Sequence, residues 1–304
     1  MDQLHHEGRA EGVLAADEQA ASGPAPYVPY DKRKLSYAGT FTDPRKVFVI
    51  RTLEWMTGKM TLLRRIRRFE RAGVPAGAPF FPRALEQMGI DLLTPQEQID
   101  NIPRSGPLIV VANHPNGIVD GMILAALVGS RRDDFVILTR SLVANIQEVR
   151  RFMLPVPFPH EKDAFRKSLE MRKRAMAQLA AGGAVLLFPA GQVAASEGWF
   201  GPAVEADWNP FTAKMIQRSG ATVLPVFFPG QNSRAYQIAN RLSATLRQGL
   251  LLHEVARVLD RPQKPVIGRP IPPEEWGRHA ASASAFMAWL RGRTLALAEE
   301  GNAG

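Results

Sequence analysis

Cysteine is absent from all 304 residues of the chain. Disulfide bonds, thiolate nucleophiles, iron–sulfur clusters and cysteine-ligated zinc are therefore excluded. The chain also lacks a long apolar run. A membrane-spanning helix needs about 20 consecutive apolar residues, whereas the longest window without a charged residue, 175–196, is broken by Gly182, Gly183 and Pro189. We therefore expect no integral membrane span, and any membrane association to be peripheral.

Several common catalytic signatures are missing as well. The sequence has no Gly-x-Ser-x-Gly elbow, no Walker loop, no Gly-x-Gly-x-x-Gly and no His-Glu-x-x-His, because His253-Glu254 is followed by Val-Ala-Arg. The motifs that usually indicate covalent serine catalysis, nucleotide hydrolysis and zinc proteolysis are therefore absent. No metal site is predicted.

The composition that remains is that of a folded, basic protein. With 45% hydrophobic and 22% charged residues, the chain is long enough for one large or two modest domains. It has 38 Lys and Arg against 29 Asp and Glu, a net charge of +9 and a pI near 10.1. Phosphate, nucleic acid and an anionic membrane all stay open as acidic partners.

The charge is distributed unevenly along the chain. Residues 1–31 carry six acidic side chains and one basic side chain among many Ala, Gly and Pro. We predict that residues 1–40 form a disordered acidic tail. Because this stretch lacks the basic start and apolar centre of a secretory signal, export is not expected.

Residues 45–71 reverse the sign, with nine basic side chains against two acidic ones. Their apolar residues recur at helical spacing, which predicts an amphipathic helix with arginines along one flank. Two interpretations are equally open. The helix packs on the main domain, or it lies in a membrane interface where each arginine contributes about 1 kcal/mol against anionic head groups. We divide the chain into the tail, a helical membrane-docking segment at 41–94 and a domain at 95–304.

Short apolar runs alternate with helical stretches after residue 95. This alternation predicts an α/β domain in which a mainly parallel mixed sheet is covered by helices, preceded by the amphipathic helical segment. The expected strands are Leu108–Val111, Phe135–Leu138, Val185–Phe188 and Val223–Phe228, with a late edge strand at Pro265–Ile271. The expected helices are 117–128, 144–152, 164–180, 210–218 and a closing helix at 282–299.

His114 lies where an expected strand ends and a helix begins, in IVVANHPNGIVDG. Ligands approach α/β sheets at such strand ends. Asp120 follows within reach, and a carboxylate there would fix the imidazole tautomer and leave the other nitrogen as a general base. The same spacing also suits a purely structural hydrogen bond between His114 and Asp120. On spacing alone, this structural interpretation is favoured over a catalytic one. The other histidines lie in the tail or have no motif around them.

Three ordered blocks resemble the glycerolipid acyltransferase superfamily, and most closely its bacterial hemolysin-like lysophospholipid acyltransferase branch. They are ANHPNGIVDG, VLLFPAGQVAAS and ATVLPVFFPGQNS, and the resemblance covers about residues 95–272. It implies that His114 is the general base, that Asp120 orients it and that the later blocks bind the acceptor. The implied substrate-binding positions are Asn113, Pro189, Gly191, Gln192 and Pro225.

The blocks depart from the commonest pattern of the superfamily in two ways. Five residues separate His114 from Asp120 instead of four, as in the hemolysin-like branch, and we expect Gly117 to absorb the extra one. Ala190 replaces the usual Glu of Phe-Pro-Glu-Gly-Thr-Arg, and Gln192-Val193 replace Thr-Arg, so the identity of the acceptor stays open. From the basic residues that follow 158, we select Arg166 and Arg172 to hold an acceptor phosphate.

The resemblance implies direct transfer of a fatty acyl group from acyl-CoA or acyl carrier protein to a lysophosphatidate-like lysophospholipid. We expect no cofactor besides this donor, a membrane lipid as acceptor, and a peripheral location at the cytoplasmic face of the inner membrane, on an anionic surface. Alternatives are a lyso-ornithine-lipid O-acyltransferase, or a non-catalytic membrane-binding protein with a decayed acyltransferase fold, suggested by Ala190 and Gln192. Only the pI suggests nucleic acid, which we do not expect as a partner.

Overall fold

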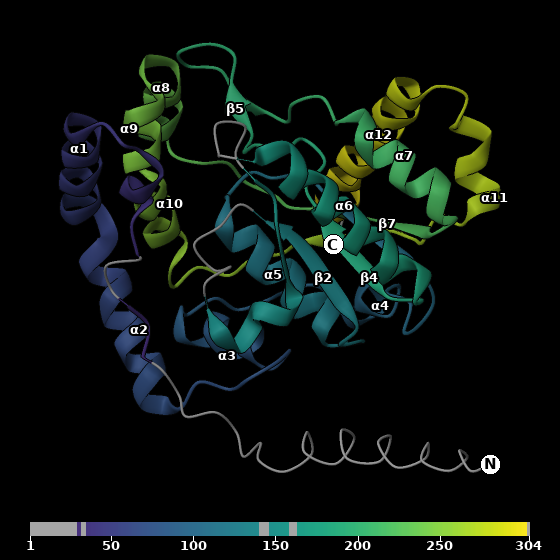
Figure 1. Ribbon diagram of the computed structural model, residues 1–304, viewed down its shortest axis with the longest axis horizontal. Helices are drawn as coiled ribbons and strands as arrows, with labels where there is room; N and C mark the ends of the chain where they lie inside the picture. Colours follow the sequence, from purple (N-terminus) through teal and green to yellow (C-terminus); the bar gives the residue numbers. More distant parts are fainter. Residues whose placement is uncertain (1–28, 32–34, 140–145, 158–162, 303–304) are drawn as a thin grey trace, which may run out of the picture.

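The computed structural model describes residues 29–31, 35–139, 146–157 and 163–302. Most of the predicted acidic tail therefore lies outside the described residues. Helices surround a central sheet of six strands, whose order is β3-β2-β4-β1-β7-β8 (Figure 1). The strands are β1 Leu108–Ala112, β2 Phe135–Thr139, β3 Met153–Pro155, β4 Ala184–Leu187, β7 Thr222–Phe227 and β8 Val266–Ile267.

The sheet is parallel except at one edge. The β1 strand pairs in parallel with β4 and β7, and β2 pairs in parallel with β3 and β4, whereas β8 runs antiparallel to β7. The predicted mainly parallel mixed α/β sheet is confirmed. The late edge strand is also present, but it is only two residues long, and Ile271 adds an isolated bridge to Val223.

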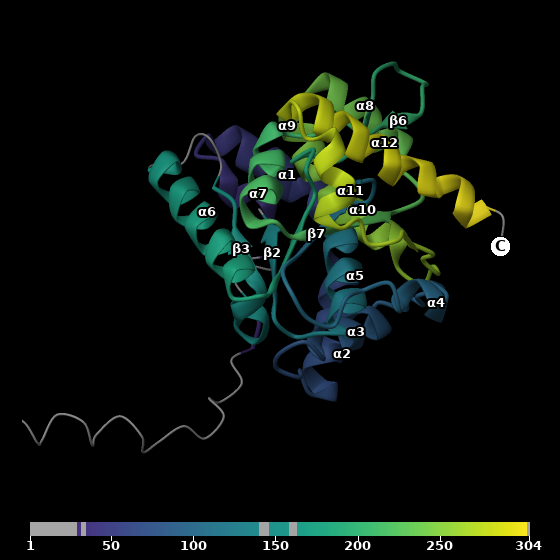
Figure 2. The ribbon, with the colours of Figure 1, turned by 90° about the vertical axis from the view of Figure 1, so that its right-hand side faces the viewer.

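Both faces of the central strand are buried, which explains its uninterrupted apolar sequence. Leu108, Val110 and Ala112 join one core cluster, and the alternating Ile109 and Val111 join the other. Helices α2, α3, α5 and α10 supply the first cluster, and α6, α7 and α12 supply the second (Figures 1 and 2). These helices are α2 Met60–Ala72, α3 Phe80–Gln87, α5 Ile118–Gly129, α6 Ala164–Ala180, α7 Pro210–Ser219, α10 Leu251–Val258 and α12 Ala283–Asn302.

The long helices were predictable, and the short elements were not. The expected helix at 164–180 is confirmed to the residue, and those at 117–128, 210–218 and 282–299 are confirmed within a few residues. The described part of the expected helix 144–152 is instead a 3-10 helix, Gln147–Phe152. Not predicted were the strand β3, the hairpin strands β5 Ala195–Ser196 and β6 Ala203–Val204, and the helices α8 Arg234–Leu242, α9 Ala244–Gly249 and α10.

The expected amphipathic helix is broken into two helices. Helix α1, Pro44–Glu54, continues through a π-helical turn, Trp55–Lys59, into α2. The break lies at Gly58, where a Cβ atom would stand 2.9 Å from the carbonyl oxygen of Leu252. The close approach of this turn to α10 therefore requires glycine, and it sets the angle between the two helices.

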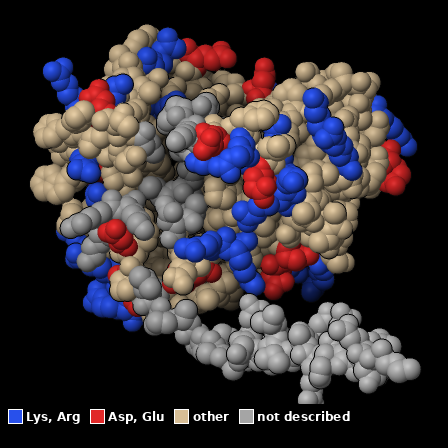
Figure 3. Space-filling view, viewed as in Figure 1, with Lys and Arg blue, Asp and Glu red and all other residues tan. Residues whose placement is uncertain are grey.

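The two helices pack on the main domain, as one of the two interpretations expects, and leave apolar side chains exposed on their outer side. On the inner side, Ile50 is fully buried and Leu63 joins the first core cluster, so the segment packs on the α/β domain. On the outer side, Phe48, Trp55 and Met56 are about 70% exposed. Figure 3 shows this surface as mostly uncharged over α1, with Lys and Arg gathered over α2. Within the described residues, no helix combines the length and apolar character needed to cross a membrane.

Candidate active site

Three neighbouring strands end at the edge of the sheet where the three sequence blocks meet. The β1 strand lies between β4 and β7, and all three run in the same direction. Asn113 and His114 therefore follow β1 beside Phe188, which follows β4, and Phe228, which follows β7. The carboxyl ends of adjacent parallel strands form the usual ligand site of such sheets.

His114 and Asp120 lie in direct contact. The Nδ1 atom of His114 is 3.1 Å from Oδ2 of Asp120, whose side chain is fully buried. Asn116 holds the same carboxylate twice, with its main-chain N–H at 2.8 Å and its side-chain amide at 3.1 Å. Because an ionised carboxylate only accepts hydrogen bonds, Nδ1 carries the hydrogen and Nε2 keeps a lone pair. This is the arrangement that a general base requires.

Gly117 makes this contact sterically feasible. Its φ of 72° lies in the left-handed region, which side chains other than glycine rarely adopt, and it immediately precedes α5. Asp120 then falls in the first turn of α5, where the helix dipole favours a carboxylate. The turn accommodates the five-residue spacing between His114 and Asp120.

Phe188 supports the imidazole from one side. The two ring centroids are 4.0 Å apart and the planes are inclined by 20°. The stacked ring restricts rotation of His114, whose side chain stays 17% exposed. The imidazole is therefore held in one plane while part of it remains open to a ligand.

The main chain of His114 is also anchored on both sides. Its N–H donates to Oε2 of Glu205 at 3.1 Å, and its carbonyl oxygen accepts from the N–H of Ala194 at 2.9 Å. The Oε1 atom of Glu205 accepts from the indole of Trp208 at 3.0 Å. Burial raises the pKa of Glu205, and the hydrogen bonds from His114 and Trp208 oppose that rise. Arg291 of α12 holds the carbonyl oxygens of Glu205 and Ala206.

Two of the residues assigned to the substrate have structural contacts instead. The side chain of Asn113 accepts from the N–H of Phe228 at 2.7 Å and donates to its carbonyl oxygen at 2.8 Å. Asn113 thus ties the ends of β1 and β7 together. Pro225 is buried within β7, opposite Val111, before that strand reaches the edge.

The other assigned residues lie in the block that follows β4 and on α6. Pro189 is buried and accepts from the N–H of Asn209 at 3.0 Å, whereas Gly191 and Gln192 are exposed in the next turn. On α6, Arg166 lies 3.5 Å from Asp163, and the Arg172 guanidinium lies 4.4 Å from the ring centroid of Phe211. Neither arginine makes a hydrogen bond or ion pair with His114 or Asp120 in the described part of the chain.

Sequence reasoning missed three contributors to this site. Phe188 was expected only as the end of a strand in one of the acceptor blocks, and Asn116 was given no role. Glu205 lies 91 residues from His114, and no motif surrounds it. Of the described residues, no three His, Asp or Glu side chains gather as metal ligands.

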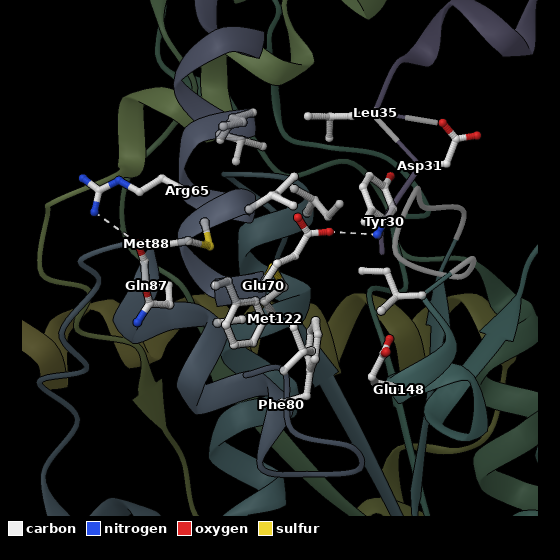
Figure 4. A pocket seen from close by; sticks show the side chains of 18 of the residues that line it. Tyr30, Asp31, Leu35, Arg65, Glu70, Phe80, Gln87, Met88, Met122 and Glu148 are labelled. Carbon is white, nitrogen blue, oxygen red and sulfur yellow. Dashed lines mark hydrogen bonds between the residues drawn. The ribbon is translucent and has the colours of Figure 1, made fainter. Parts of the chain in front are cut away.

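An apolar cavity of about 350 Å³ lies behind the site. Helix α5 forms one wall through Ile118 and Met122, the residues two positions before and after Asp120. Figure 4 shows Phe80 and Met122 in its lining, with Arg65 and Glu148 on opposite sides. Helix α5 thus carries the carboxylate of the site and lines the cavity.

Residues 85–260 match the protein-family model described as Acyltransferase, which is more than half of the chain. The chain belongs to this acyltransferase family. The match confirms the resemblance noted in the sequence, and it includes His114, Asp120 and Glu205.

Two curated relatives are named lyso-glycine lipid O-acyltransferase. The protein from Phocaeicola vulgatus is 28% identical over 181 residues, which are 57% of this chain and 62% of that protein. The protein from Bacteroides thetaiotaomicron is 28% identical over 174 residues, which are 53% of this chain and 61% of that protein. The matched region thus spans about three fifths of each relative.

A solved structure of similar extent is the 1-acyl-sn-glycerophosphate (LPA) acyltransferase PlsC from Thermotoga maritima. The superposition covers 88% of this chain and 86% of that chain, with a TM-score of 0.49 and 15% sequence identity.

Proposed function

We propose that this protein transfers a fatty acyl group from a thioester donor, acyl-CoA or acyl carrier protein, to a hydroxyl group of a lysolipid. The observation that carries the proposal is the contact between His114 Nδ1 and the buried Asp120, which leaves Nε2 as a base at the ligand-binding edge of the sheet. Family membership supports the reaction class.

The chemistry is a direct displacement. The Nε2 atom of His114 takes the proton of the acceptor hydroxyl while its oxygen attacks the thioester carbonyl carbon. The carbon–sulfur bond then breaks, and the imidazolium returns its proton to the departing thiolate. Asp120 stabilises the imidazolium between these steps. No acyl-enzyme forms, so the absence of cysteine and of a serine elbow is no obstacle.

The cavity behind α5 suits the fatty acyl chain. Its walls are mainly apolar, and residues of α2, α3, α5 and α10 contribute to it. Burying an acyl chain there is favourable by about 0.8 kcal/mol per methylene. Ile118 and Met122 lie two positions before and after Asp120, on the opposite face of α5, so this helix separates the cavity from the carboxylate.

For the acceptor, we favour an amino-acid lysolipid over lysophosphatidate. Both curated relatives bear the name of a lyso-glycine lipid acyltransferase. In addition, Arg166 pairs with Asp163 and Arg172 stacks on Phe211, so the arginines chosen to hold a phosphate have partners elsewhere. A lyso-ornithine lipid belongs to the same chemical class, and lysophosphatidate stays the comparison substrate.

The exposed apolar side chains of the α1 region support peripheral docking on the membrane that holds the acceptor lysolipid. Phe48 is exposed on α1, Trp55 and Met56 are exposed on the π-helical turn after it, and arginines follow on α2. Such a combination favours an anionic interface. We place this membrane surface at the cytoplasmic face of the inner membrane, where acyl thioesters are supplied.

The decisive experiment is an acyl-transfer assay on the purified chain. Each donor is combined with lyso-glycine lipid, lyso-ornithine lipid and lysophosphatidate, and the released thiol is followed with a thiol-reactive dye. Because the chain has no cysteine, the dye reports only the product. We expect transfer to the amino-acid lysolipids to be fastest. Preference for lysophosphatidate would overturn the acceptor assignment. No transfer to any acceptor would favour the non-catalytic membrane-binding alternative.

A further inference from the structure

A short hairpin projects beside the active site. Its strands, β5 and β6, pair antiparallel with Ala195 opposite Val204 and Ser196 opposite Ala203. Residues 197–202 form the tip, which stands with α8 at one end of the molecule in both views (Figures 1 and 2). A two-stranded hairpin of this length is not stable by itself in water. Its order must come from contacts at the base and the tip.

The base of the hairpin is fastened to the main chain of His114. Ala194, immediately before β5, donates to the carbonyl oxygen of His114 at 2.9 Å. Glu205, immediately after β6, accepts from the N–H of His114 at 3.1 Å. Both ends of the hairpin therefore hydrogen-bond to the residue that carries the proposed base.

The tip is held in shape by α8 and by its own strand. Arg241 donates to the carbonyl oxygen of Glu197, and its guanidinium lies 5.1 Å from the ring centroid of Trp199. Arg234 donates to the carbonyl oxygen of Gly201. The Ser196 hydroxyl lies 2.9 Å from the same oxygen and 2.6 Å from that of Gly198. These contacts hold the tip in one conformation.

This braced tip presents aromatic rings to the outside. Phe200 is 84% exposed and Trp199 is 47% exposed. Large exposed apolar side chains on an ordered support mark interaction sites. Trp and Phe in front of arginines are the side chains that favour the interface of an anionic membrane.

The neighbouring helices favour a lipid surface over a protein partner. Helix α1 packs on α9, α9 on α8, and α8 on β5, so the outer face of α1 and the hairpin belong to one continuous layer. Leu242, the last residue of α8, adds a further exposed apolar side chain, at 60% exposure. Two separated apolar elements that share a basic layer suit an extended anionic bilayer better than a compact protein epitope.

We propose that the β5–β6 hairpin is a second membrane contact, which seats Trp199 and Phe200 in an anionic lipid interface and connects that contact to the main chain of His114. This proposal rests on the proposed function, because the membrane contact would serve acyl transfer to a lysolipid. Lipid engagement at the tip would hold the histidine loop close to the surface from which the acceptor lysolipid arrives.

A single-site fluorescence experiment tests the contact. Because the chain has no cysteine, Phe200→Cys provides a unique attachment point for a polarity-sensitive dye. Asp133→Cys is the matched control, since its side chain is 78% exposed and it precedes the amino end of β2, the opposite edge of the sheet. On vesicles of phosphatidylglycerol and phosphatidylcholine in equal parts, the dye at position 200 should brighten and shift to the blue, while the dye at position 133 should not change. A dye at position 200 that stays unchanged while the protein sediments with the vesicles would overturn the proposal.

A binding experiment tests the energetic contribution of the rings. Trp199→Ser combined with Phe200→Ser should weaken vesicle binding by about tenfold or more, given the apolar area lost. Leu93→Ser, which removes a 53% exposed side chain just before helix α4, Gln96–Ile99, is the control and should bind as the native chain does. Unchanged binding of the double variant would overturn the proposal. Since neither readout needs turnover, a chain that transfers no acyl group would refute the proposed function and still leave both tests decisive.

Discussion

The main-chain N–H of His114 donates to the carboxylate of Glu205 at 3.1 Å, across 91 residues of sequence. The same carboxylate accepts a hydrogen bond from the indole of Trp208, and the main-chain carbonyl oxygen of Glu205 accepts one from Arg291. Asp120 and Phe188 position the imidazole, whereas Glu205 positions the backbone beneath it. His114 is thus held through its side chain and through its main chain.

Removing the imidazole should abolish most of the activity. We expect His114→Ala to lower kcat/KM for acyl transfer by about 10² to 10⁴, which is the usual contribution of a general base. The variant also leaves the buried Asp120 without one hydrogen-bond partner, so the free energy of unfolding should fall by about 1 to 3 kcal/mol. Steady-state kinetics and thermal unfolding measure the two effects. His279→Ala, which removes a ring stacked on Trp289, is the control and should stay active. Equal rates for His114→Ala and the native chain would refute the base assignment.

Replacing the buried carboxylate should impair both rate and stability. In Asp120→Asn, one amide hydrogen faces donors from His114 or Asn116, so at least one hydrogen bond is lost. We expect kcat to fall by about 10² to 10⁴ because the tautomer of His114 is no longer enforced, and the free energy of unfolding to fall by about 1 to 3 kcal/mol. A variant that is destabilised but fully active would show that Asp120 serves only the fold.

Glu205 should make stability depend on pH in a defined direction. Its folded-state pKa is raised above 4.5 by burial. The stability that Glu205 contributes is therefore complete below the unfolded-state pKa and declines as the pH rises through the folded-state pKa. In Glu205→Gln this titration is absent. The free energy of unfolding of the native chain minus that of the variant should decrease from about pH 4 to about pH 8. Urea unfolding at several pH values measures this difference, and an increase with pH would contradict the assignment.

Narrowing the cavity should change the selection of acyl chains. Met122→Trp places a larger side chain in the wall of the 350 Å³ cavity, two positions after Asp120 on α5. We expect kcat/KM with long-chain donors to fall by roughly tenfold or more, since overpacking costs about 1 to 3 kcal/mol, while short-chain donors react at nearly the native rate. A panel of acyl-CoA chain lengths measures this shift. A uniform loss at all lengths would show that the acyl chain binds elsewhere.

The strands and the contact between His114 and Asp120 were predictable because the signals are local. Strands that are buried on both faces read as continuous apolar runs, and Leu108–Ala112 is such a run. His114 and Asp120 are six residues apart across a strand end and a helix start, so the chain geometry itself brings them together. The long helix Ala164–Ala180 was equally visible, because its apolar residues recur over several turns.

Residues whose partners are distant in sequence were not predictable. Asn113 was assigned to the substrate, yet its amide meets the backbone of Phe228, 115 residues away. The two-residue strands of the hairpin are too short to show a period, and α8 to α10 are helices of at most nine residues. Their positions depend on packing against the rest of the molecule.

By itself, the sequence determined the class of fold, the strand edge at which His114 lies, and the pairing of His114 with Asp120, because each depends on residues near one another in the chain. Only the tertiary structure decided that Glu205 anchors the backbone of His114, that Arg172 stacks on Phe211, and that α1 is buried on one side and exposed on the other. The reason is physical. Hydrogen bonds and burial between distant segments depend on how the completed layers pack, which no local pattern of residues records.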